Sequence, residues 1–110
     1  MAEIQISIES QNADTAAEDL FTIEGLEGSW ELVSESSPNK EGTLAVIGTI
    51  VGIVGGGIAI AEQIRKWYKE YKQSHPDKQF DVVIIGPSGR VVMEDATIEE
   101  IYEVLRALEK

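Results

Sequence analysis

The chain has 110 residues and a formal net charge of -11, from 20 acidic and 9 basic residues. A chain this acidic repels phosphate backbones, so we expect no nucleic-acid partner. The absence of cysteine excludes disulfides, thiolate nucleophiles and cysteine-ligated zinc. The length suits one domain spanning residues 1–110. The N-terminus is acidic and has no basic region followed by an apolar run, so we expect no signal peptide.

Alternation of apolar and polar residues marks the first element. Glu3–Glu9 carries isoleucine at every second position, and this period predicts a half-buried strand. Thr15 and Glu18 have the spacing of a helix capping box, which predicts a short helix that ends near Phe21.

A glycine-containing turn region follows this helix. Gly25 and Gly28 indicate the turn, and the apolar residues in the range 30–33 predict a second strand. The segment Ser34–Gly42 is polar and contains Pro38 and Asn39, so we expect an exposed loop.

The central segment is uncharged from Thr43 to Ala61. We predict one long helix over residues 43–73, apolar in its first half, amphipathic in its second, and ended by Pro76. The alternative is a break near Gly55–Gly57 that divides the span into two short helices, because glycines weaken a helix. Gly48, Gly52 and Gly56 recur every four residues. On a helix they would line one face that allows close helix packing and oligomerisation.

The second half of this segment combines aromatic and basic residues. Residues of these types are enriched in protein interfaces and also at membrane surfaces. We therefore expect interface anchors at Arg65, Lys66, Trp67, Tyr68 and Tyr71.

The last third of the chain is predicted to form a hairpin and a helix. Phe80–Ile85 is rich in β-branched residues and predicts a strand buried on both faces. Gly86–Gly89 has the residue order of a tight turn that leads to a partner strand over residues 91–93. Thr97 and Glu100 form a capping-box pair and open a helix that ends near Leu108.

The predicted element order is therefore β-α-β-α-β-β-α. We expect an α+β fold with a small mixed sheet and one long glycine-rich apolar helix.

No set of residues indicates catalysis. His75 is the sole histidine, and its sequence context does not indicate the oriented acid partner that acid–base or Ser-His-Asp chemistry requires. Gly55–Gly57 lacks the lysine and hydroxyl residue that follow a phosphate-binding loop. The acidic residues do not match a calcium loop. We expect a protein that is not an enzyme and that has no cofactor and no metal.

The order of these features resembles the effector-associated constant component family. The stretches that carry the resemblance are Glu3–Ile8, Ala45–Trp67, Phe80–Ile85, Gly89–Val92 and Ile98–Leu108. The resemblance implies a small non-catalytic component of a bacterial conflict or antiviral defence system. Such components accompany effectors that include peptidases. Relatives are richer in alanine and leucine in the central helix, where this chain has isoleucine, valine and glycine.

Three functional hypotheses follow. In the first, a cytoplasmic component assembles with itself or with a peptidase-like effector through its glycine-rich helix. In the second, the same helix inserts into a membrane after a trigger such as cleavage in the loop that contains Ser36, Pro38 and Lys40. In the third, the acidic chain acts as an inhibitor or nucleic-acid mimic, on the strength of its charge alone.

Overall fold

The structure is a computed structural model that describes residues 3–35, 44–74, 80–87 and 89–108. It contains five strands, three α-helices and two one-turn 3-10 helices within these ranges. In chain order they are β1 (Ile4–Ser10), α1 (Ala13–Leu20), β2 (Leu26–Glu35), β3 (Leu44–Ile53), α2 (Gly57–Ser74), β4 (Phe80–Gly86), β5 (Gly89–Val92), η1 (Met93–Asp95), α3 (Ile98–Leu105) and η2 (Arg106–Leu108).

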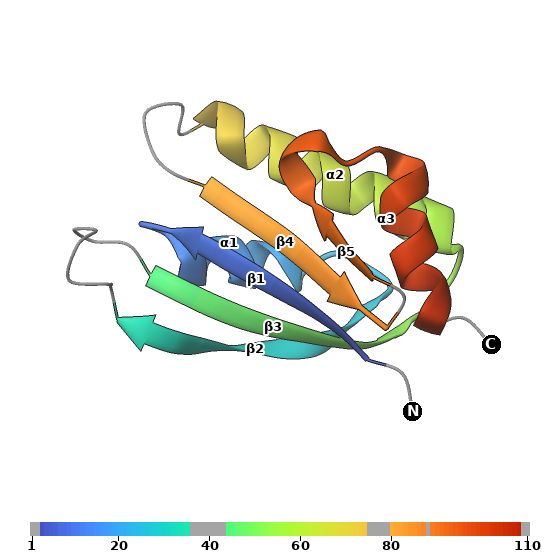
Figure 1. The fold of residues 1–110 in the computed structure, drawn as a ribbon, viewed down its shortest axis with the longest axis horizontal. Helices are drawn as coiled ribbons and strands as arrows, with labels where there is room; N and C mark the ends of the chain where they lie inside the picture. Colours follow the sequence, from blue (N-terminus) through green and yellow to red (C-terminus); the bar gives the residue numbers. More distant parts are fainter. Residues whose placement is uncertain (1–2, 36–43, 75–79, 88, 109–110) are drawn as a thin grey trace.

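The five strands form one sheet in the order β2-β3-β1-β4-β5 (Figure 1). Every neighbouring pair is antiparallel. The α+β class is confirmed, but the sheet is antiparallel and not mixed. The β4–β5 hairpin is also confirmed, because Gly86 pairs with Gly89 at its end.

The long central helix is not confirmed. Its first half is strand β3, which pairs with β1 on one side and β2 on the other. Within the central segment, only α2, which has 18 residues, is helical. The element order of the described residues is therefore β-α-β-β-α-β-β-α. An uncharged apolar run is compatible with either a buried helix or an interior strand. The isoleucine and valine residues favour the strand, and the glycines weaken a helix.

Gly48 makes room for an aromatic ring on the sheet. A Cβ at this position would lie 2.8 Å from Phe21 Cε2 and 2.9 Å from Ile6 Cγ2. Gly52 lies beside the Glu27 carboxylate, and Gly56 lies in the connection between β3 and α2. The three glycines therefore do not line one face of a helix.

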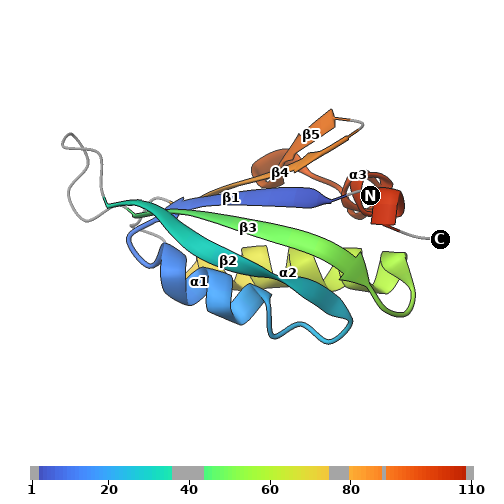
Figure 2. The same ribbon diagram turned by 90° about the horizontal axis from the view of Figure 1, so that it is seen from below.

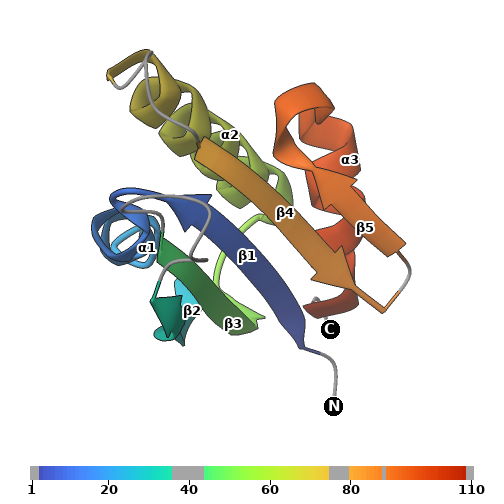
Figure 3. The same cartoon turned by 60° about the vertical axis from the view of Figure 1, so that its left-hand side comes forward.

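All three helices cover the same face of the sheet. Figure 2 shows α1 and α2 on one side of the strands, and Figure 3 shows α2 and α3 behind β4 and β5. Ile4, Ile6 and Ile8 of β1 are fully buried beneath this helical layer. The buried residues form one hydrophobic cluster that includes residues of all three helices.

An aromatic cluster closes this core near the end of α2. The Phe80 ring centroid lies 5.6 Å from that of Trp67, 5.3 Å from that of Tyr68 and 5.0 Å from that of Tyr71. Because Trp67, Tyr68 and Phe80 are all buried, their contacts stabilise the attachment of α2 to the sheet.

Two local predictions need correction and one is confirmed. Helix α1 begins after Asn12, so Thr15 lies inside the helix and does not cap it. Strand β4 is buried on one face only, because Ile85 is exposed. The capping box of Thr97 and Glu100 is present at the start of α3.

Candidate functional site

The face of the sheet opposite the helices carries no helix in the described part of the chain. Strand register places its residues in rows that cross the sheet. In one row Ile47 is opposite Ser7, Ser7 is opposite Val83, and Val83 is opposite Val92. The next row contains Thr49, Gln5, Ile85 and Arg90. We call the surface formed by these two rows the open sheet face.

Apolar side chains on this face remain in contact with solvent. Ile85 is 42% exposed and Val92 is 44% exposed, while Ile47 and Val83 are half-buried. Val51, at a bulge in β3, adds a further side chain that is 60% exposed. Apolar residues grouped on one surface are typical of interaction sites.

The charges beside the open sheet face are mainly acidic. Glu9 and Asp81 are cross-strand partners, and Glu31 is opposite Ile47. Like charges on directly opposite residues of a sheet repel each other. Arg90, the cross-strand partner of Ile85, is positively charged. A partner with an apolar centre and basic residues around it would complement this pattern.

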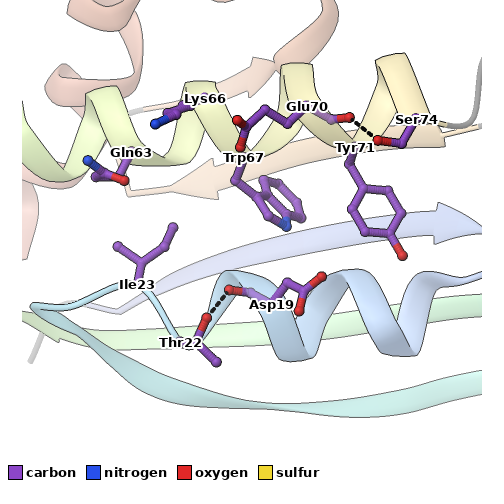
Figure 4. A pocket seen from close by; sticks show the side chains of 9 residues that line it. All are labelled: Asp19, Thr22, Ile23, Gln63, Lys66, Trp67, Glu70, Tyr71 and Ser74. Carbon is purple, nitrogen blue, oxygen red and sulfur yellow. Dashed lines mark hydrogen bonds between the residues drawn. The ribbon is translucent and has the colours of Figure 1, made fainter.

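A second candidate is a groove of about 440 Å³ between α1 and α2. Figure 4 shows the Tyr71 side chain of α2 directed toward α1, with Asp19 on the opposite wall. Lys66 and Glu70 also line the groove. The groove therefore contains charges of both signs.

The polar groups of this groove are engaged in local structure. The Thr22 hydroxyl donates to the Asp19 carbonyl at 2.6 Å, and the Ser74 hydroxyl donates to the Glu70 carbonyl at 2.9 Å. The Trp67 indole N–H donates to the Ala16 carbonyl at 3.1 Å. The Trp67 bond joins α2 to α1, and the other two are local to the end of one helix each. None of the three forms a pair of nucleophile and base.

The Tyr71 hydroxyl, which lines the same groove, has a raised pKa. Partial burial raises the pKa of the Tyr71 hydroxyl above 10.0, and the nearby carboxylates of Asp19 and Asp14 add to the effect. Both causes disfavour the phenolate. Tyr71 is therefore a neutral hydroxyl at physiological pH and not an activated base.

The predicted interface anchors do not share one surface. Trp67 and Tyr68 are buried in the domain's own core. The Arg65 guanidinium donates to the Ala96 carbonyl at 3.3 Å, which links α2 to the start of α3. Lys66 is exposed and Tyr71 is half-buried beside the α1–α2 groove.

Other predictions concern residues that the structure does not describe. The candidate cleavage loop with Ser36, Pro38 and Lys40 lies outside the described residues, and so does His75. In the ranges that are described, no group of three or more acidic, histidine or cysteine residues is placed to hold a metal. No helix there has both the length and the apolar character needed to cross a bilayer.

The open sheet face was not predicted from the sequence for two reasons. Ile47 and Thr49 lie in a segment predicted to be helical, and β4 was predicted to be buried on both faces. The alternation of Asp81, Val83 and Ile85 with the buried Phe80, Val82 and Ile84 was the available signal for a half-exposed strand.

No family model, curated protein or solved structure matches this chain.

Proposed function

We propose that this chain is a non-enzymatic binding component that recognises another protein through the open sheet face. The observation that carries the proposal is the apolar group formed by the exposed Ile85 and Val92 and the half-buried Val83, on a sheet whose other face is covered by helices. Antiparallel sheets commonly have one face in contact with water, and that face is then mainly polar. The grouped apolar side chains are what distinguish this face, and a partner would cover them.

The charge of the chain favours a different protein over a second copy. Three acidic residues are on or beside the open sheet face: Glu9, Glu31 and Asp81. Among the residues in register with it, the one basic residue is Arg90. Two copies face to face would bring two acidic surfaces together. The net charge of -11 adds repulsion at low ionic strength.

The sequence resemblance suggests where to look for the partner. It favours a peptidase-like effector of a bacterial conflict system. One of its matching stretches, Ala45–Trp67, comprises strand β3 and part of α2 and not a single helix. The resemblance therefore supports the choice of partner class only through pattern and spacing.

The proposal is tested by quantitative capture of proteins from the native host with the full chain as bait. Ile85→Lys places a charge on the open sheet face at a side chain that is 42% exposed. Leu32→Lys is the matched control, because Leu32 is 45% exposed and pairs with the buried Val46 on the helix-covered side of the sheet.

We expect Ile85→Lys to lose a specific protein that wild type and Leu32→Lys both retain. Sedimentation of the purified chain checks for self-association, and we expect a monomer. A partner retained equally by both variants would contradict the role of the open sheet face, and so would a dimer that Ile85→Lys dissociates.

A further inference from the structure

A second groove lies where the α1–β2 and β3–α2 connections meet. Its volume is about 830 Å³, within the range of about 300–1,000 Å³ that is typical of ligand sites. The Val54 N–H donates to the Gly25 carbonyl at 2.7 Å and joins the two connections. This main-chain hydrogen bond fixes the two connections relative to each other where they line the groove.

Gly25 is required for this arrangement. Its φ is +94°, and a Cβ there would lie 2.5 Å from the Val54 carbonyl oxygen. Gly55 also has a positive φ, of +97°. Both positions favour glycine for reasons of backbone conformation.

Gly56 has no such requirement. Its φ is not positive, and a Cβ there would have no neighbouring atom within 4 Å. Its carbonyl accepts from the Ile60 N–H at 3.2 Å at the start of α2, a position at which serine, asparagine or aspartate would cap the helix at least as well. A bare backbone beside an open groove is suited to close approach by the main chain of another molecule.

The groove combines apolar walls with acidic charge. Leu26, Val54 and Ile60 contribute apolar surface, and Val54 is 61% exposed. Among its lining residues the charged ones are Glu24 and Glu27, with no lysine or arginine. An anionic ligand is repelled by this lining, and a ligand with basic and aliphatic groups complements it.

We propose that this groove binds an extended segment of the partner protein that carries lysine or arginine next to aliphatic side chains. This inference rests on the proposed function, because the segment belongs to the same partner that binds the open sheet face. The groove is a second contact with that partner. The main chain of the segment passes over Gly56, and its basic side chain pairs with Glu24 or Glu27. The positive end of the α2 dipole disfavours a cation directly above the helix start, so the basic group is expected at one of these two carboxylates and not over Gly56.

The test is a titration of the 15N-labelled full chain with acetyl-Val-Lys-Val-Lys-Val-amide. We expect the amide signals of Gly25, Gly55 and Gly56 to shift. Acetyl-Val-Glu-Val-Glu-Val-amide, of similar length and shape, should leave them unchanged. Absence of these shifts at about 5 mM lysine peptide, a concentration that detects millimolar affinity, would overturn the inference, as would equal shifts with both peptides.

Variants of the groove give a second readout. Gly56→Leu should weaken binding of the lysine peptide at least tenfold while the chain stays folded, because the added side chain points into open space. Glu24→Gln and Glu27→Gln should each weaken it about threefold, as expected for one exposed ion pair. Glu62→Gln, on α2 but outside the groove lining, is the matched control and should have no effect. An unchanged affinity in Gly56→Leu would contradict the proposed path of the segment.

The two proposals fail separately. If the lysine peptide does not bind but partner capture still depends on Ile85, the groove inference is wrong and the proposed function stands. If capture is indifferent to Ile85, the proposed function is wrong whatever the peptide does.

Discussion

Gly48 offers a quantitative test of the strand assignment. Gly48→Ala adds one methyl group 2.8 Å from the Phe21 ring and 2.9 Å from Ile6. Overpacking of this kind costs about 1–3 kcal/mol. Replacing glycine in a strand recovers about 0.5–1 kcal/mol. We expect a net destabilisation of about 1 kcal/mol.

The other two glycines of the series provide internal comparisons. Gly56→Ala meets no atom within 4 Å. The Gly56 carbonyl accepts from the Ile60 N–H at 3.2 Å at the start of α2, a cap position at which glycine is favoured over alanine. This loss offsets the gain from restricting the unfolded state, so the stability should stay within about 0.5 kcal/mol of wild type. Gly52→Ala meets only the Glu27 side chain, whose carboxylate oxygen lies 2.8 Å away and can move. Its stability should stay within about 0.5 kcal/mol of wild type.

Urea unfolding followed by tryptophan fluorescence measures these differences. With an m value of about 2 kcal/mol/M for a domain of this size, the midpoint of Gly48→Ala should lie about 0.5 M below that of Gly56→Ala. In a helix, alanine would be favoured over glycine at all three positions. A Gly48→Ala chain at least as stable as Gly56→Ala would refute the packing of Phe21 on β3.

A double mutant identifies the cause of the effect. Phe21→Leu removes the ring atoms that a Cβ at residue 48 would meet. In this background the cost of Gly48→Ala should fall by at least half, since contacting residues show coupling energies of about 0.5–3 kcal/mol. Simple additivity of the two changes would show that the ring is not responsible.

Three further predictions concern the core, a helix cap and a titrating group. Phe80→Ala removes the centre of the aromatic cluster and should cost about 3–5 kcal/mol in urea unfolding; a loss below about 1 kcal/mol would contradict the packing. Thr97→Ala removes the capping box of α3 and should cost about 1 kcal/mol, whereas Thr15→Ala, inside α1, should not destabilise; equal losses would contradict the assigned caps. The raised pKa of Tyr71 keeps the phenol protonated in the folded state, so stability is full below pH 10 and falls as pH rises through the folded-state pKa. Tyr71→Phe should reduce this alkaline loss, and ultraviolet titration of Asp19→Asn should show the pKa of Tyr71 closer to its ordinary value; an unchanged titration would exclude Asp19 as a cause.

Elements with strong local signals were predictable from the sequence. The isoleucine alternation gave β1, the Gly86–Gly89 turn gave the last hairpin, and Thr97 with Glu100 gave the start of α3. Each of these signals is contained within a few residues, so no knowledge of distant neighbours was needed.

Strand β3 and the open sheet face were not predictable in this way. The uncharged run of Leu44–Ile53 has no local feature that distinguishes an interior strand from a buried helix. Gly48 is explained by Phe21 and Ile6, which are distant in sequence and reach it through the fold. Which side of β4 is covered depends on where the three helices pack, and this is set by tertiary structure.

The central claim, that the open sheet face binds a partner, is tested most directly by methyl NMR. The chain, labelled at isoleucine and valine methyl groups, is compared alone and with the captured partner. The account predicts that the methyl signals of Ile47, Val83, Ile85 and Val92 shift, while that of the buried Ile64 of α2 does not. Unchanged signals on the open sheet face, with shifts confined to residues of the helical layer, would contradict it.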